Sequence, residues 1–225
     1  MGGKYNHGSK GLKMDDTEGG WHDRLLSWYH LSNKKSVHLQ LQNQIHMALI
    51  LPVEGNHPAW GNNCFIAPNA TIVGDVVMGD NCSVWFNTVI RGDVNSIRLG
   101  NAVNVQDGAV IHCTFLKTKT LIGNNVSIGH NAIVHGCVVH DNVLIGMGSI
   151  IMDGAIVNSN TIIAAGAVVL ENTICEGGAV YAGVPAKKVK DIAPEKVEGE
   201  IHRIANNYIK YAKWFAAVNE AGLQI

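Results

Sequence analysis

A period of six residues governs the chain from residue 66 to residue 174. A period of six excludes an α-helix, which repeats every ~3.6 residues, and it excludes simple hairpins. It is typical of a β-solenoid, in which each hexapeptide supplies one short strand and one corner, and three hexapeptides (about 18 residues) close a triangular coil. We therefore predict an all-β fold, a parallel β-helix shaped as a triangular prism. One class of positions carries only small or aliphatic residues, which we expect to fill the prism interior: Ala70, Val76, Cys82, Thr88, Val94, Val103, Ala109, Val126, Ala132, Val138, Leu144, Ile150, Ile156, Ile162, Val168 and Ile174.

The period breaks twice. The step from Val94 to Val103 is three residues longer than one hexapeptide, and the step from Ala109 to Val126 is five residues longer than two. Extra residues must leave a stacked coil as loops, which we predict at about 95–98 and 113–121. Insertions in solenoids tend to lie on the functional face, so this region is the first place to look for a site.

The repeat divides the chain into three parts. Residues 1–46 lack any sustained period and are predicted to be an extension, mostly disordered, with a short helix at 24–31. Residues 47–190 are predicted to form the β-helix. Residues 191–225 follow with an amphipathic C-terminal helix that packs on the prism, because apolar residues recur there at helical spacing after Pro194: Val197, Ile201, Ile204, Tyr208, Ala212 and Phe215.

Composition narrows the partners and the compartment. The formal net charge is −1 without a long basic or acidic block, and no apolar run is long enough to span a membrane. We therefore expect neither a nucleic acid nor a membrane as a partner. The five cysteines include no C-x-x-C pair, which predicts reduced core thiols and a cytoplasmic location.

Three histidines lie beside the second break. Once the five-residue insertion is removed, His112 and His135 are one full coil apart, so they should stack about 5 Å from each other and could hold one metal ion. Arg91 falls one coil below His112 in the same column. His130 occupies a different repeat position, so three imidazoles on one ion require His130 of a neighbouring subunit, as in a cyclic trimer. The alternative for each histidine alone is an ordinary surface side chain.

Four segments of the sequence resemble one known family. "VIRGDVNSIRLG", "NVQDGAVIH", "IGHNAIVHGCVV" and "YAGVPAKKV" are similar to motifs of the γ-class carbonic anhydrases, left-handed β-helix proteins with hexapeptide repeats, over about residues 55–215. The resemblance implies a homotrimer with Zn²⁺, Fe²⁺ or Co²⁺ held by His112 and His135 of one subunit and His130 of the next.

The resemblance also assigns roles around the metal. It implies that Arg91 and Asp93 form an interface ion pair, although the two could equally form a plain structural pair. It implies that Gln106 is a hydrogen-bond partner near the metal-bound water and that Asp107 supports the site. Tyr181 either reaches the site or serves in packing.

The implied activity is that of a carbonate dehydratase, a lyase that hydrates carbon dioxide to bicarbonate with a metal-bound hydroxide. The family pattern has a glutamate after the Asp of the R-x-D motif and an acidic loop after the first histidine. Here Val94 and the uncharged or basic "CTFLKTKT" stand at these places, so we expect slow proton export and low activity.

Three alternatives stay open on the same fold. The chain could be a hexapeptide-repeat acyltransferase, a CoA-thioester hydrolase, or a trimeric metal-binding scaffold with little catalysis. A single catalytic histidine in a long loop would favour the acyltransferase. Three histidines, two of them in one-coil register, favour the metal site.

Overall fold

The structure, a computed structural model, describes residues 47–220, with side chains described as far as residue 215. The predictions for residues 1–46, an extension with a short helix at 24–31, lie outside the described residues. None of the described helices is both long enough and apolar enough to cross a bilayer.

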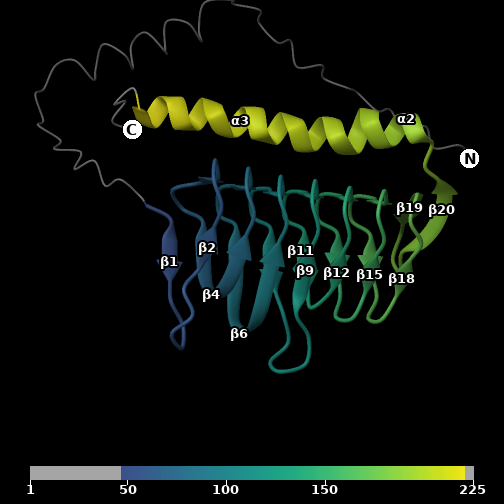
Figure 1. The fold of residues 1–225 in the computed structure, drawn as a ribbon. Helices are drawn as coiled ribbons and strands as arrows, with labels where there is room; N and C mark the ends of the chain where they lie inside the picture. Colours follow the sequence, from purple (N-terminus) through teal and green to yellow (C-terminus); the bar gives the residue numbers. More distant parts are fainter. Residues whose placement is uncertain (1–46, 221–225) are drawn as a thin grey trace, which may run out of the picture. The chain divides into compact units, whose positions relative to one another are not determined.

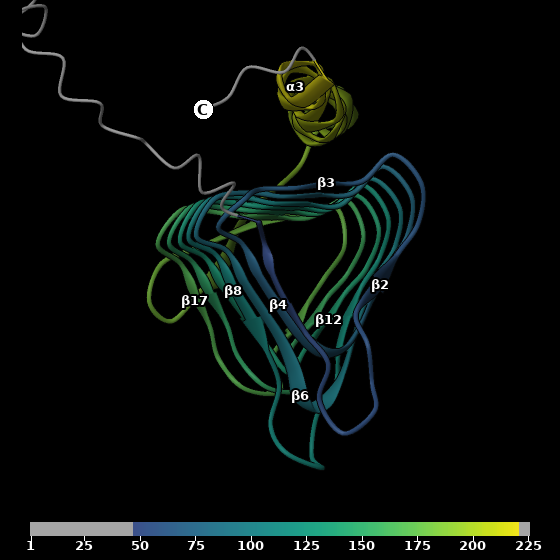
Figure 2. The ribbon, with the colours of Figure 1, turned by 90° about the vertical axis from the view of Figure 1, so that its left-hand side faces the viewer.

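Residues 49–191 form the predicted left-handed β-helix, whose three faces enclose a triangular interior (Figures 1 and 2). A twelve-stranded sheet bends at the long strands β4 and β6 and so makes two faces. The first face carries β8, β11, β14 and β17, and the second carries β9, β12, β15 and β18. The strands of this sheet are β1 (Leu49–Leu51), β2 (Ala59–Trp60), β4 (Thr71–Met78), β6 (Val89–Leu99), β8 (Val110–His112), β9 (Thr120–Ile122), β11 (Ile133–His135), β12 (Val138–Val139), β14 (Ile150–Ile151), β15 (Ile156–Val157), β17 (Val168–Val169) and β18 (Ile174–Cys175).

The third face is an eight-stranded sheet in the order β20-β19-β16-β13-β10-β7-β5-β3. Its strands pair in parallel except β20, which is antiparallel to β19 and closes the last coil. They are β3 (Phe65–Ile66), β5 (Ser83–Val84), β7 (Asn104–Val105), β10 (Ser127–Ile128), β13 (Leu144–Ile145), β16 (Ile162–Ile163), β19 (Ala179–Ala182) and β20 (Lys187–Asp191).

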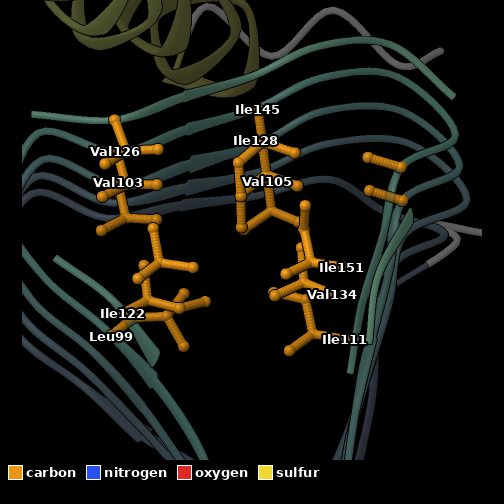
Figure 3. Packing of buried hydrophobic residues seen from close by; sticks show 14 of the residues in the cluster. Leu99, Val103, Val105, Ile111, Ile122, Val126, Ile128, Val134, Ile145 and Ile151 are labelled. Atoms are coloured by element: carbon orange, nitrogen blue, oxygen red, sulfur yellow. The ribbon is translucent and has the colours of Figure 1, made fainter. Parts of the chain in front are cut away.

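The core is a set of side-chain ladders inside the prism. On the first face Val134 pairs with Ile111 of the coil before and Ile151 of the coil after, and none of the three is exposed. Ladders from the other two faces meet this one in the interior (Figure 3). Each coil therefore packs chiefly on the coils directly before and after it.

The six-residue period is confirmed, but the last seven of the sixteen positions in the predicted interior class, from Val138 onward, face outward. As far as Ala132 the class is buried, apart from the half-buried Val94, whereas Ile174 is 64% exposed. The phase changes because Val134 and Val139 are five residues apart while their partners Ile151 and Val157 are six apart. The coil that contains Val134 and Val139 is therefore one residue short. From this coil onward, the buried position is one residue earlier than predicted: Cys137, Val143, Ser149, Ala155, Thr161, Ala167 and Ala179.

Both predicted insertions lie at the corner between the first and second faces. Gly74 pairs with Gly92 and Val76 with Ile97, so Asp75 alone lies opposite residues 93–96. The first insertion is thus slightly earlier than the predicted 95–98. The second leaves the coil as a loop at residues 113–119, between β8 and β9, within the predicted range. This loop projects from the corner of the prism (Figure 2).

The predicted C-terminal helix is present and covers the third face. It comprises α2 (Pro194–Lys196), a π-helical stretch η1 (Val197–His202) and α3 (Arg203–Glu220). α3 contacts β3, β5 and β7 of the first coils. Aromatic rings form the contact: the Trp85 ring lies 5.3 Å from that of Tyr208 and 5.4 Å from that of Phe215, measured between centroids. Packing of these aromatic rings of α3 against Trp85 of the β-helix holds the helix in place.

Candidate metal centre

The structure stacks His112 and His135 as the one-coil register predicts. They end strands β8 and β11, and their Cα atoms are direct partners in the sheet. Their ring centroids are 5.2 Å apart, and His112 Nδ1 lies 3.1 Å from His135 Nε2. Two nitrogens on a tetrahedral ion with Zn–N bonds of about 2.0–2.1 Å are about 3.3 Å apart, so the two rings fit two ligand positions of one ion.

Carboxylates fix which nitrogen of each ring is free. His112 Nε2 lies 3.2 Å from Asp93 Oδ1, and His135 Nδ1 lies 2.7 Å from Asp153 Oδ2. A carboxylate accepts the ring N–H, so in both neutral rings the lone pair lies on the opposite nitrogen. The two lone pairs then face each other across 3.1 Å. That arrangement is repulsive unless a cation lies between them, which is the chemistry of a metal site.

Arg91 and Asp93 complete this group from β6. Arg91 Nη1 donates to Asp93 Oδ2 at 2.6 Å, and Arg91 Nη2 is 3.5 Å from His112 Nδ1. Burial and then the nearby guanidinium lower the pKa of His112, which keeps the ring neutral at pH 7. Burial alone would raise the pKa of Asp93, but hydrogen bonds from Arg91 and His112 outweigh it and lower that pKa. We call Arg91, Asp93, His112 and His135 the column half-site.

Asp153 is a member of the group that the sequence analysis missed. Its Oδ2 takes the His135 bond, and its Oδ1 accepts hydroxyl hydrogen bonds from Thr114 at 2.8 Å and Thr118 at 2.6 Å. Burial would raise the pKa of Asp153, but these bonds lower it. A search for carboxylates about one coil from each histidine would have found Asp153, which follows His135 by 18 residues, although Val134 and Ile151 in this shortened coil are only 17 apart.

His130 lies in a second group at another corner. It follows β10, and its Nδ1 is 2.9 Å from Oδ2 of Asp107, which precedes it by one coil. Tyr208 of α3 brings its hydroxyl to 3.5 Å from His130 Nε2. Gln106 is beside Asp107 in the chain and nearly buried, and its amide donates to Asn104 Oδ1 at 3.0 Å. We call Gln106, Asp107 and His130 the turn half-site.

One described chain does not bring the two half-sites together. His135 ends β11, whereas His130 lies in the turn that precedes this strand, at the other edge of the first face. Among residues 47–220 no group of three or more His, Cys, Asp or Glu could hold a metal ion within one chain.

Tyr181 lies apart from both half-sites. It belongs to β19 in the last coil, it is 6% exposed, and its hydroxyl accepts a bond from the Glu176 backbone N–H at 2.7 Å. Of the two roles that the sequence left open, its burial and its local hydrogen bond favour packing.

Comparison with known proteins supports the same family as the motifs. The bacterial transferase hexapeptide model (six repeats) matches residues 61–92 and 136–171. A protein of Methanocaldococcus jannaschii named "Probable carbonic anhydrase" is 54% identical over 67% of this chain and 92% of its own length. "Gamma carbonic anhydrase 2, mitochondrial" of Arabidopsis thaliana is 35% identical over 90% of this chain and 72% of its own.

The chain belongs to the γ-class carbonic anhydrase family. A solved structure, named as a hexapeptide transferase family protein from Anaplasma phagocytophilum, shares the fold with this family member. Its TM-score is 0.70 at 38% identity, covering 74% of this chain and 98% of that one. Proteins that share this fold are thus named for different activities, so the function has to be argued from the residues of the site.

Proposed function

We propose that this chain is a carbonate dehydratase, hydrating carbon dioxide reversibly at a metal ion shared between subunits of a homotrimer. The ion, Zn²⁺ or else Fe²⁺ or Co²⁺, would be held by His112 and His135 of one subunit and by His130 of the next. The observation that carries the proposal is the pair of ring nitrogens 3.1 Å apart, each with its other nitrogen on a carboxylate.

The two half-sites support a shared site. They lie at opposite edges of the first face, so a neighbouring copy can bring its turn half-site to the column half-site only by packing against this face. The outer surface of the face is suited to this, because Val110, Ile133, Ile150 and Val168 form an aliphatic column along it. Ile133 is 38% exposed in the single chain. Burying such a column is a normal source of association free energy.

When bound, a divalent ion on three neutral imidazoles supplies Lewis acidity toward water near neutral pH at an open coordination position. The chain's own residues do the rest. Asp93 and Asp153 hold the two rings with their free nitrogens facing each other. Arg91 in turn holds Asp93 through the bond of 2.6 Å. Asp107 holds His130, the ring offered to the next subunit.

Transfer of the proton from the site to buffer is the slow step of the proposed reaction. Val94 is a half-buried apolar residue against the core, and the loop at 113–119 contains no carboxylate. The two carboxylates beside the rings, Asp93 and Asp153, are both occupied by hydrogen bonds. A general acid or base must be free to exchange its proton with buffer, so this chain relies on small diffusible buffers.

The acyltransferase alternative has less support. It needs a histidine base on a long loop, and the inserted loop at 113–119 contains none. The thioester hydrolase and the inert scaffold share the metal site, so they are outcomes of the experiment below. We also propose a cytoplasmic location, supported by five cysteines that all carry free thiols.

The test combines metal content with stopped-flow hydration of carbon dioxide on protein reconstituted with Zn²⁺, Fe²⁺ or Co²⁺. We expect one ion per chain, hydration that depends on it, and loss of both in His112→Ala. His140→Ala is the matched control, since this exposed histidine lies outside both half-sites. A metal-replete protein that does not hydrate carbon dioxide in any buffer would leave only the hydrolase or the scaffold.

A further inference from the structure

Two hydroxyls anchor the inserted loop at residues 113–119 to Asp153, beside the column half-site. Thr114 and Thr118 lie at either end of its turn, and both donate to Oδ1 of Asp153. Thr118 Oγ1 also accepts the Thr114 backbone N–H at 3.1 Å, which closes the loop on itself. The same carboxylate is bonded through Oδ2 to His135. One side chain, only 16% exposed, therefore joins the loop to a ligand of the proposed ion.

Gly136 makes this arrangement possible. It lies in the coil that is one residue short, with φ of +56°. A side chain there would collide with both the Asp153 carboxylate and the Thr118 hydroxyl. The left-handed backbone favours glycine, and a residue without a side chain is required here to leave the space in which loop and carboxylate meet. The shortened coil, the glycine and the two threonines thus serve a single contact.

We propose that Asp153 is a positioning residue that couples the conformation of the loop at 113–119 to metal binding at His135. The inference rests on the proposed function, because it requires that His135 binds a metal. Partners of this kind orient a ligand ring, and their loss typically weakens metal binding by about 10–100-fold. Coupling is reciprocal: if the anchored loop strengthens metal binding, bound metal must stabilise the anchored loop to the same degree.

The reciprocity makes the loop itself a reporter. Lys117 and Lys119 are exposed in it, so trypsin can cut there when the loop leaves its anchor. In the wild-type trimer we expect Zn²⁺ to slow cleavage at these lysines. In Asp153→Asn the ring loses its carboxylate and the loop loses its charged acceptor, so Zn²⁺ should no longer protect the loop.

The affinity for Zn²⁺ is measured in parallel by competition with a chelator. We expect Asp153→Asn to weaken binding about 10–100-fold, and Thr114→Val with Thr118→Val to weaken it by a smaller factor while the His135–Asp153 bond remains. The double variant also decides the question if Asp153→Asn does not fold. Asp141→Asn is the control, because Asp141 accepts the Asn124 backbone N–H at 2.6 Å outside the two half-sites.

The outcomes separate the two proposals. Wild-type affinity and zinc protection in both variants would overturn the coupling and leave the metal site intact. The same holds if wild-type cleavage does not respond to Zn²⁺ while Zn²⁺ binds. Absence of any Zn²⁺, Fe²⁺ or Co²⁺ binding by the wild type would instead overturn the proposed function, and the coupling with it.

Discussion

Subunit sharing can be tested by mixing chains that are each defective in a different half-site. A His130→Ala chain keeps the column half-site, and a His112→Ala chain keeps the turn half-site. All three chains of a pure trimer carry the same substitution, so each shared site lacks either His130 or His112. Each pure trimer should therefore bind no metal at its three sites.

The mixture has a calculable content of complete sites. When the two chains are unfolded together and refolded in equal amounts, about three quarters of cyclic trimers contain both kinds. Around a ring of three, any mixed trimer has only one junction at which an intact column half-site meets an intact turn half-site. The mixture should thus recover about one quarter of the wild-type metal content, measured by elemental analysis of the purified trimer.

A second mixture provides the control. His112→Ala and His135→Ala both damage the column half-site, so no arrangement of these two chains completes a site. This mixture should remain without metal. Metal recovery in this control, or none in the first mixture once mixed trimers are verified by mass, would refute a site divided between His130 and the column.

Three further predictions concern the core, the catalytic step and the N-terminal segment. Ile145→Ala empties a fully buried position and should lower the free energy of unfolding by about 2–5 kcal/mol. Ile174→Ala, at a position 64% exposed, should lower it by less than about 1 kcal/mol. Denaturant titration at one trimer concentration compares the two variants, and equal losses would contradict the phase change. Imidazole buffer should strongly raise the maximal hydration rate measured by stopped flow. Val94→Glu should also raise this rate and make it depend less on the buffer concentration. A rate that does not depend on buffer in the wild type would show that proton export is not limiting. A chain beginning at Met47 should still form trimers and bind metal by light scattering and elemental analysis, and its failure would show that residues 1–46 contribute to assembly.

The sequence was sufficient for the fold because six-residue spacing has few structural solutions. It was misleading about which residues face inward after residue 132. From Val138 onward, each hexapeptide has apolar residues at two neighbouring positions, such as Leu144 and Ile145, so the aliphatic class alone does not show which of the two faces inward. Only the pairing of Val134 and Val139 with Ile151 and Val157 reveals the missing residue.

The site was predictable where it obeys the repeat. His112, His135 and Arg91 share a column because whole coils separate them once insertions are removed, and the contacts agree. Tyr208 was recognised as helical, but its approach to His130 depends on how α3 lies across the third face. That placement comes from tertiary packing of aromatic rings, for which a local pattern has no signal. Asp153 follows His135 by 18 residues where the coil has only 17, so the strict repeat does not place the two side chains together.

The path of the C-terminal helix has a consequence for how the molecule unfolds. A stack of coils that contact only their neighbours behaves as a linear array, and its ends can fray one coil at a time. Here the chain leaves the last coil through β20 and returns along the third face, where Phe215 packs against Phe65 of the first coils (Figure 1). The first coils cannot open without losing their contacts with α3, and the last coil cannot open without freeing the segment that leads to this helix. The helix thus turns an array of separable units into one cooperative unit, and amide exchange should be uniformly slow from β5 to β16 and not graded toward the ends.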